Sequence, residues 1–324
     1  MLREVSIEII RKCQNHCLHC SSESDKSCPE RLPLSKFKEV VFDAAKLGAE
    51  TICLSGGEPF LHSDVHEMIN YIHALGLMCF IYTSGIVCDS TGNNIAISKD
   101  FLSCIAKDNT KLIFNIEAAT EETYNRIMGT ERCFSIMQES VQNAVSLGFL
   151  IEAHFVPMKL NINEIDAVIR LCKYLKISKV SFLRLVPHGR AEKHLSDIML
   201  SVDQTVQLKE KLKKLQEQYK DAIRIGVPLS STLLCHKCEA ADGKLNIRYD
   251  GKVFPCEVFK NCPLTKSLGQ LSPNSIYEDT LLDIYQESAY LQFIRNLSTR
   301  FYRSTDETCL GQHLLEIERS NSHG

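Results

Sequence analysis

The chain has 324 residues, of which 44% are hydrophobic and 24% are charged, and its formal net charge is −3. This is the composition of an ordinary soluble globular protein, and without a basic run it gives no basis for binding nucleic acid. No apolar run approaches the ~20 residues that a membrane-spanning helix requires, so we expect no membrane partner.

Strands and helices are predicted to alternate along the chain. Apolar runs with a strand pattern occur at 5–10, 51–54, 78–82, 112–116, 150–156 and 180–185. Helical periodicity follows at 34–47, 64–75, 98–107, 134–147 and 162–175, and a longer helix is predicted at 201–219. Six such alternations with short connections indicate parallel strands with helices outside them. On this ground alone the sheet is either doubly wound or a barrel.

The chain contains 15 cysteines, a high number for an intracellular enzyme. Met1 leads directly into a strand and not into a secretory signal. We therefore expect a cytoplasmic protein in a reducing compartment, where a disulfide framework does not form. Two groups of cysteines have the spacing or setting of metal ligands: Cys13, Cys17 and Cys20, and then Cys235, Cys238, Cys256, Cys262 and Cys309.

The first group, Cys13-x3-Cys17-x2-Cys20, lies in the loop after the first predicted strand. Thiolates this close can share one metal centre and can hardly pair as disulfides. A structural zinc site has four ligands and is closed, whereas three ligands leave a coordination position open for chemistry. The alternative is a zinc knuckle with His16 or His19 as the fourth ligand, although zinc sites usually have paired Cys-x2-Cys arms.

This cysteine loop resembles that of the radical S-adenosylmethionine (SAM) superfamily, whose hallmark is Cys-x3-Cys-x2-Cys after the first barrel strand. The resemblance implies a partial (β/α)6 barrel of the TIM type over residues 1–190. It implies that Cys13, Cys17 and Cys20 hold a [4Fe-4S] cluster and that SAM binds the open iron. SAM would then be cleaved reductively to a 5′-deoxyadenosyl radical, which abstracts hydrogen from a substrate. An electron donor such as flavodoxin or ferredoxin would supply the electron.

Gly56-Gly57-Glu58 follows the second predicted strand. Two glycines let a backbone approach a ligand closely, and carbonyl and carboxylate oxygens accept bonds from an ammonium group. A glycine-rich turn with a solvated glutamate is the alternative interpretation. In the family, this segment holds the amino group of SAM. By the same resemblance, Ser84 after the third strand contacts the methionine or ribose part, and Glu117, where relatives often carry Asp, contacts the ribose.

Two arginines complete the predicted SAM site. Arg126 lies in a segment that looks like the family's Asp-x-x-Arg-Gly region, and it either clamps the SAM carboxylate in bidentate fashion or is a surface side chain of a helix. Arg184 opens the segment 184–191, which resembles the Arg-x-x-Pro-x-Gly-Arg-Ala segment of relatives with a C-terminal cluster domain. In those relatives the backbone of this segment helps to seat the adenine.

The second cysteine group predicts a small cysteine-rich C-terminal domain. Cys235-x2-Cys238 and Gly251-x4-Cys256, with a hairpin predicted around Gly251, resemble the opening of SPASM or twitch auxiliary-cluster domains. The resemblance implies a helical linker at 191–234 and the auxiliary domain at 235–324. It also implies one auxiliary iron–sulfur cluster, held by Cys235, Cys238, Cys256 and either Cys309 or Cys262. The alternative is a zinc ribbon, formed by Cys235, Cys238, Cys256 and Cys262.

The resemblance implies a radical SAM enzyme, of the oxidoreductase or peptide-modifying type, that acts on a peptide or protein side chain. Auxiliary-cluster relatives often modify ribosomally made peptides. Small-molecule or cofactor biosynthesis is the alternative. A non-catalytic metal-binding interaction or sensor protein is an alternative of another class, but the segment 56–58 would have no purpose there without SAM.

Overall fold

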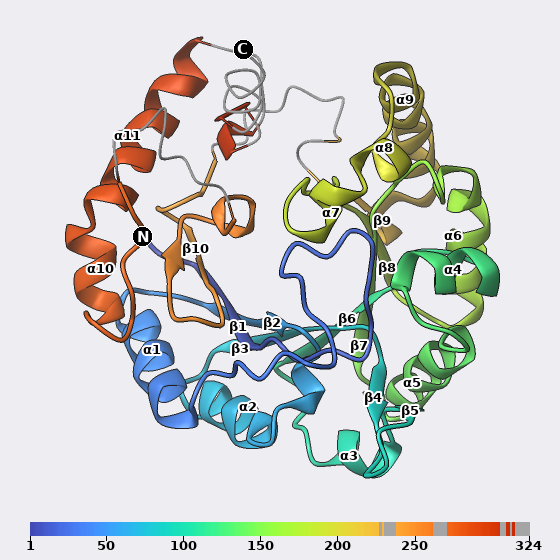
Figure 1. Ribbon diagram of the computed structural model, residues 1–324, viewed down its shortest axis with the longest axis horizontal. Coiled ribbons are helices and arrows are strands. Elements are labelled where there is room, and N and C mark those ends of the chain that lie inside the picture. The colour runs from blue at the N-terminus through green and yellow to red at the C-terminus, as the bar shows by residue number, and fades with distance from the viewer. Residues whose placement is uncertain (227–228, 230–237, 262–270, 305–308, 312, 315–324) are drawn as a thin grey trace.

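A curved sheet of nine strands organises the chain (Figure 1). The computed structural model describes residues 1–226, 229, 238–261, 271–304, 309–311 and 313–314. The strands are β1 (Glu4–Ile10), β2 (Thr51–Gly56), β3 (Met78–Thr83), β6 (Thr110–Asn115), β7 (Leu150–Phe155), β8 (Lys179–Phe182), β9 (Ile223–Ile225), β10 (Lys244–Ile247) and β11 (Val253–Phe254). Their order in the sheet is β11-β10-β1-β2-β3-β6-β7-β8-β9, and each neighbouring pair is parallel except β10 with β11.

Helices follow most of the strands. They are α1 (Leu34–Lys46), α2 (Val65–Ala74), α3 (Lys99–Ser103), α4 (Glu121–Met128), α5 (Phe134–Ser146), α6 (Ile165–Tyr174), α7 (Arg190–Lys193), α8 (Leu195–Ile198), α9 (Val202–Tyr219), α10 (Leu281–Glu287) and α11 (Ala289–Ser304). A separate antiparallel hairpin joins β4 (Ile86–Cys88) to β5 (Asn94–Ala96). Figure 1 shows α1, α2, α5 and α6 on the outer side of the sheet and the loop after β1 on its inner side.

The two faces of the sheet differ in polarity. The outer face and the helices share the apolar core, to which α1 contributes Phe37, Val40, Val41 and Ala44. Successive side chains of a strand point to opposite faces. Along β7, Ile151 and Ala153 belong to the apolar core, so Glu152 and His154 point to the inner side. No helix in the described part of the chain has the length and apolar character needed to cross a membrane.

The predicted fold class, a partial (β/α)6 barrel, is confirmed. All six predicted strands are present, and in the described part of the chain the sheet that they form with β9, β10 and β11 has β9 and β11 as its two edges. The largest boundary differences are at α3, which ends at Ser103 and not at 107, and at β8, which ends at Phe182, so Arg184 lies beyond the strand. Just beyond the strand, the N–H of Leu183 still donates to the carbonyl oxygen of Phe155 on β7 at 2.9 Å.

The C-terminal hairpin is joined to the barrel sheet. The predicted strands around Gly251 are present as β10 and β11, and β10 pairs in parallel with β1, with Glu4 opposite Lys244. These two residues are 240 positions apart, and no local sequence pattern indicates such a pairing. The domain boundaries after residues 190 and 234 remain a prediction.

A buried polar network lies on the inner side of β7. Glu152 Oε1 is 3.3 Å from His154 Nε2 and 3.4 Å from Arg224 Nε, and Glu152 Oε2 is 3.6 Å from Lys111 Nζ. The hydroxyl of Ser181 donates to the same carboxylate. Burial alone would raise the pKa of Glu152, but hydrogen bonds from His154 and Ser181 hold it at about 2.

This low pKa makes the stability of the fold depend on pH. An unfolded glutamate titrates near pH 4.3, so the unfolded chain takes up the proton first as the pH falls. The contribution of Glu152 is therefore present above that pH and is lost as the pH falls toward 2. We expect the free energy of unfolding in urea, followed from about pH 6 to about pH 3.5, to fall less steeply in Glu152→Gln than in the wild type. Glu122→Gln, at an exposed carboxylate, is the control and keeps the wild-type slope. Equal slopes for Glu152→Gln and the wild type would contradict this expectation.

Candidate functional site

The loop after β1 carries Cys13, Cys17 and Cys20 at the carboxyl end of the sheet, where the catalytic groups of parallel barrels gather. Backbone bonds attach this cysteine loop to the end of α4, since the N–H of His16 donates to the carbonyl oxygen of Met128 at 2.9 Å. Inside the loop, the N–H of Cys20 donates to the carbonyl oxygen of Cys17 at 3.2 Å. These bonds help to set the path of the backbone that carries the thiols.

The three thiols lie within electrostatic reach of one another. Burial raises the pKa of Cys13, and the nearby Glu58 and Cys20 raise it further. Burial likewise raises the pKa of Cys17, with Cys13 and Cys20 adding to the shift. Buried thiols that would repel one another as thiolates fit a metal cofactor, because a cationic centre offsets both costs. In the described residues, no three His, Cys, Asp or Glu side chains are arranged around a single metal ion.

Three further polar atoms of the cysteine loop also fit a bound group. They are buried without a hydrogen-bond partner in the described part of the chain: Gln14 Oε1, Asn15 Nδ2 and His19 Nδ1. Buried polar atoms are normally satisfied by protein, water or a ligand. Their position beside the thiols, together with the thiol chemistry, makes this loop suitable for a cofactor with both metal and polar groups.

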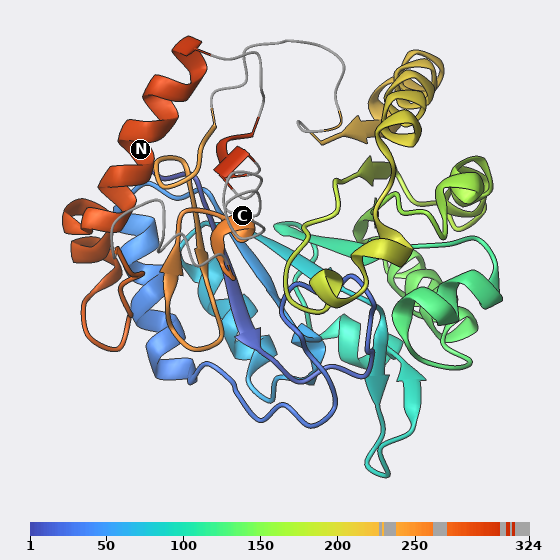
Figure 2. The ribbon, with the colours of Figure 1, turned by 45° about the horizontal axis from the view of Figure 1, so that its top comes forward.

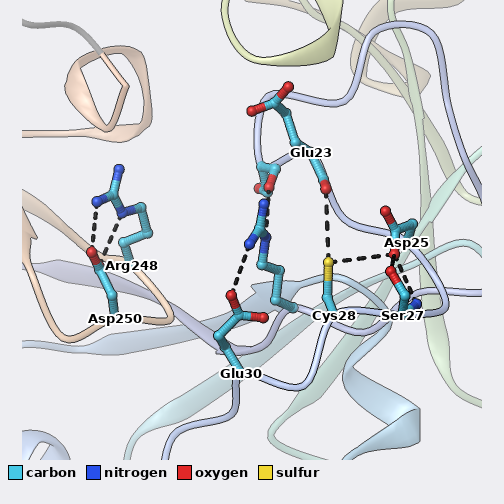
Figure 3. Close-up of polar contacts among 9 residues, drawn as sticks. Glu23, Asp25, Ser27, Cys28, Glu30, Arg248 and Asp250 are labelled. Atoms are coloured by element: carbon cyan, nitrogen blue, oxygen red, sulfur yellow. Dashed lines mark hydrogen bonds and ion pairs between the residues drawn. The ribbon is translucent and has the colours of Figure 1, made fainter.

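The far half of the cysteine loop is held by polar contacts, which Figure 3 shows. Asp25 Oδ1 accepts bonds from the N–H of Ser27 at 2.8 Å, from its hydroxyl at 2.6 Å and from Cys28 Sγ at 3.5 Å. The bond from the Ser27 hydroxyl is the main reason why the pKa of Asp25 is only about 2. Arg11 Nη1 lies 2.8 Å from Glu30 Oε1. These contacts support the conformation of the segment that carries the cysteines.

Gly57 packs directly against the start of the cysteine loop. A Cβ atom on Gly57 would collide with the carbonyl oxygens of Arg11 and Lys12, and it would lie 2.5 Å from the former. The N–H of Gly57 donates to the carbonyl oxygen of Ile10 at 2.6 Å, and the N–H of Glu58 donates to that of Lys12 at 2.9 Å. Gly57 therefore approaches the backbone of the cysteine loop closely, and the contact of this segment with SAM stays a prediction.

Gly57→Ala is expected to displace the cysteine loop, because backbone atoms and not flexible side chains surround the missing Cβ. Overpacking of this kind typically costs about 1–3 kcal/mol. After anaerobic reconstitution, we expect this variant to retain less than about half of the wild-type iron. Gly243→Ala is the matched control, since its added Cβ meets the Glu239 side chain at 3.2 Å. Wild-type iron content in Gly57→Ala would show that the close packing has no such role.

Glu58 and Ser84, both predicted to contact SAM, are brought together and bonded to each other. Glu58 is fully buried, and its Oε2 accepts bonds from the N–H of Ser84 at 2.9 Å and from its hydroxyl at 2.7 Å. Glu58 Oε1 accepts from the Thr83 hydroxyl at 2.7 Å. Burial raises the pKa of Glu58 in spite of these bonds. The carboxylate thus joins the ends of β2 and β3.

Glu117 links the ends of β6 and β7 to the cysteine loop. Its side chain is 1% exposed, and its Oε2 accepts a bond from the N–H of Val156 at 2.9 Å. Its Oε1 lies 3.4 Å from Nε2 of His19, the residue that precedes Cys20. A predicted ribose contact therefore lies beside the predicted cluster ligands.

Arg190, which is missing from the predicted site, is buried against the cysteine loop. Its Nη1 donates to the carbonyl oxygen of Cys17 at 2.9 Å, and its Nη2 donates to that of Ser24 at 2.8 Å. Gly189, with φ of 59°, lets the chain approach, because a Cβ there would lie 2.6 Å from the carbonyl oxygen of Ser21. The only sequence signal for Arg190 is its place in the 184–191 motif, where it reads as an ordinary charged residue.

The two predicted arginines lie in different settings. Arg184 is half-buried in the segment after β8, whereas Arg126 is exposed on α4, whose buried residues are Tyr124, Ile127 and Met128. A SAM contact from either arginine remains a prediction.

Two of the late cysteines, Cys238 and Cys309, lie within electrostatic range of a third, Cys256. Burial raises the pKa of Cys256, and the charges of Glu257, Cys238 and Cys309 raise it further. Cys238 and Cys309 are 71 positions apart in the sequence, so it is the fold that assembles this second thiol group. Cys235 and Cys262 lie outside the described residues, so Cys235 as a ligand and the choice between Cys309 and Cys262 as the fourth ligand stay predictions.

The C-terminal segment also reaches the cysteine loop through a buried ion pair. Lys260 Nζ is 2.5 Å from Glu8 Oε1 and donates to the Ser22 hydroxyl at 2.7 Å, and that hydroxyl donates to Glu8 Oε1 at 2.7 Å. Asn261 adds a bond to the carbonyl oxygen of Ser21. A contact between residues 252 positions apart could not be predicted from the sequence pattern.

A curved parallel sheet with a thiol-rich loop at its carboxyl end defines an α/β barrel with a metal-cofactor site. Residues 7–172, half of the chain, match the family model of the radical SAM superfamily, and residues 238–311 match the SPASM model, an iron–sulfur cluster-binding domain. The chain belongs to the radical SAM superfamily of enzymes. This assignment implies a [4Fe-4S] cluster and SAM as cofactors, with further iron–sulfur binding in the second part.

Individual relatives cover most of the chain at low identity. The PqqA peptide cyclase of Methylobacterium sp. (strain 4-46) is 27% identical over 300 residues, which are 90% of this chain and 74% of that protein. The Fe-coproporphyrin III synthase of Methanosarcina barkeri is 24% identical over 64% of this chain, and the match spans only 51% of that protein. Streptococcus suis SuiB, solved with its precursor peptide SuiA, has a TM-score of 0.71 and 15% identity over 91% of this chain and 67% of SuiB. The last likeness shows the fold alone.

Proposed function

We propose that this chain is a peptide-modifying radical SAM enzyme in which Cys13, Cys17 and Cys20 hold the [4Fe-4S] cluster that binds SAM. The observation that carries the proposal is the convergence of separate segments on the cysteine loop. The turn 56–58 packs against its first residues, α4 bonds to its middle, and Arg190 bonds to its carbonyl oxygens.

The residues of the chain have distinct parts in this proposal. When bound, the cluster and SAM supply a 5′-deoxyadenosyl radical that removes a hydrogen atom from the substrate. The backbone of Gly56, Gly57 and Glu58 holds the SAM amino group, and Ser84 and Glu117 hold its methionine or ribose part. Arg184 and Arg126 complete the site, the latter only if its exposed side chain turns inward. The burial around Glu58 and Glu117 keeps water away from the reacting centre.

The second thiol group is proposed to bind an auxiliary iron–sulfur cluster through Cys238, Cys256, Cys309 and Cys235. Two observations support this cluster. Cys238 and Cys309 both raise the pKa of Cys256, and residues 238–311 match an iron–sulfur cluster-binding domain. That match favours iron–sulfur over the zinc-ribbon alternative. A flavodoxin or ferredoxin is proposed as the electron donor to the first cluster.

A peptide is the substrate class that the comparisons favour. The relative that covers 90% of this chain is named as a peptide cyclase, and SuiB has been solved with a precursor peptide. A small-molecule or cofactor substrate is the second candidate, because Fe-coproporphyrin III synthase also matches, though over a smaller part of this chain.

The test is release of 5′-deoxyadenosine from SAM and dithionite after anaerobic reconstitution. We expect release by the wild type and none by Cys17→Ala, while Cys104→Ala, at an exposed cysteine, behaves as the wild type does. Wild-type iron should exceed the four atoms of one [4Fe-4S] cluster, and Cys256→Ala should lower it to about four. A wild type that is loaded with iron but releases no 5′-deoxyadenosine would overturn the proposed function.

A further inference from the structure

On the inner face of the sheet, the part formed by β6 to β9 carries an excess of positive charge. We call it the positive wall; it consists of Lys111, Glu152, His154, Ser181 and Arg224, on β6 to β9. Burial lowers the pKa of His154, so its imidazole is neutral at neutral pH. The positive wall therefore sets two cationic side chains against one carboxylate.

Arg224 is fixed by the positive wall but keeps donors for a ligand. Its Nε donates to the Ser181 hydroxyl at 2.8 Å and is 3.4 Å from Glu152 Oε1, and its Nη2 is 3.4 Å from His154 Nε2. A guanidinium has five N–H donors in a fixed plane. The side chain is 47% exposed, so the remaining donors are accessible from the inner side of the barrel.

The opposite side of the barrel has the opposite charge. This acidic wall consists of Glu4, Ser6, Lys244 and Glu257: Ser6 Oγ donates to Glu257 Oε1 at 2.6 Å, and Lys244 Nζ is 3.0 Å from Glu4 Oε1. Two carboxylates here face one ammonium group. Figures 1 and 2 show the strands of the acidic wall, β1 and β10, across the inner side of the sheet from β8 and β9.

Tyr82 lies on β3 between the two walls, and charged groups of both walls affect its pKa. Its ring centroid is 5.4 Å from that of His154. Burial raises the pKa of Tyr82, the charges of Glu4 and Glu257 raise it further, and Arg224 lowers it. The two walls therefore lie within electrostatic range of a single side chain.

The positive wall begins next to the proposed SAM site. His154 is opposite Asn115 in the sheet, two residues before Glu117. Glu117 accepts the N–H of Val156 and lies 3.4 Å from His19 of the cysteine loop. Two residues of strand span about 6.6 Å, so a group bound at the positive wall lies one side-chain layer below the proposed SAM site.

We propose that Arg224 is the substrate-anchoring residue and binds a carboxylate of the peptide substrate. This inference rests on the proposed function and adds the chemical class of the recognised group. A planar guanidinium binds a carboxylate through two parallel N–H bonds, which a neutral amide cannot match. The acidic wall repels a carboxylate in the reverse orientation, so the segment enters the barrel in one direction. The carboxylate belongs either to an acidic side chain or to a chain terminus.

Three matched probes test the anchor: N-acetylglutamate α-amide, with a side-chain carboxylate; N-acetylglutamine, with a terminal carboxylate; and N-acetylglutamine α-amide, which is neutral. Each is titrated against the reconstituted protein with SAM and without reductant, and binding is followed by ligand-observed NMR. We expect one carboxylate probe to bind about tenfold more tightly than the neutral probe, as a charge-assisted bond predicts. Which of the two binds more tightly identifies the source of the carboxylate.

In Arg224→Gln this preference should disappear, and in Arg224→Lys, which keeps the charge without the planar fork, part of it should return. Circular dichroism checks that both variants fold. Arg170→Gln, at an exposed arginine of α6, should keep the wild-type preference. No preference in the wild type, or an unchanged preference in Arg224→Gln, would overturn the anchor. Because the titration needs no radical chemistry, its outcome is independent of the 5′-deoxyadenosine assay, which tests the proposed function.

Discussion

Replacing Arg190 by Met is expected to abolish cluster assembly at the cysteine loop while the barrel stays folded. The buried guanidinium donates to the carbonyl oxygens of Cys17 and Ser24, and Met can donate to neither. Each hydrogen bond from a charged group contributes about 1.5–3 kcal/mol. The loss falls on the loop itself, because both acceptors belong to it. We expect iron content and the visible absorption of the reconstituted cluster to drop to the level of Cys17→Ala.

Two variants sharpen this test. Lys193→Gln, in the same short helix, removes an exposed pair with Glu23 at 2.7 Å, and surface pairs of this kind contribute about 1 kcal/mol or less. It should keep the wild-type iron content. Arg190→Lys should give an intermediate value, because one ammonium group cannot copy the planar fork that reaches two acceptors. Full iron loading in Arg190→Met would show that the other contacts of the loop suffice.

Lys260→Met is expected to destabilise the whole protein. It removes the partner of Glu8, whose side chain is 2% exposed, and leaves a buried carboxylate uncompensated. Breaking a buried pair in this way costs about 3–5 kcal/mol. We expect a loss of that size in the free energy of unfolding, measured by denaturant titration. Lys36→Met, which removes an exposed pair with Glu39, is the control and should change it by about 0.5 kcal/mol or less.

The double variant Glu8→Gln with Lys260→Met distinguishes the contribution of the ion pair from that of the surrounding contacts. Removing both charges avoids the uncompensated carboxylate, so we expect the double variant to be more stable than Lys260→Met alone. Additive effects of the two substitutions would mean that the ion pair contributes no coupling, and the C-terminal segment would then be held at the cysteine loop by other contacts, such as that of Asn261.

Local patterns predicted the parts of this protein that local physics determines. The alternation of strands and helices follows from hydrophobic periodicity, and Cys13, Cys17 and Cys20 lie within eight residues of one another. Gly57 lies at a close approach, as its residue type indicates, and the atoms it approaches are backbone atoms of Arg11 and Lys12; a contact of this segment with SAM stays a prediction. The identity of the approached atoms depends on how β1 and β2 pair.

Contacts between distant segments could not be predicted in the same way. Arg190 lies 173 positions from Cys17, and Lys260 lies 252 positions from Glu8. Each reads in the sequence as one charged residue among many, since 24% of the chain is charged. Only the folded chain shows that these two cations are buried. A single buried polar residue repeats with no period along the chain, so it leaves no signal in a sequence window.

The pairing of β10 with β1 has a consequence for how the chain can be divided. Without β10, those backbone N–H and C=O groups of β1 between Glu4 and Ile7 that point to β10 would lose their partners, and β1 would become an edge strand. A strand so rich in Val and Ile with an open edge is a template for association with other chains. The C-terminal segment therefore serves the barrel as an edge cover as well as a carrier of cysteines. A fragment cut after residue 190 would keep every residue of the first thiol group yet expose that edge, and it would be prone to aggregate.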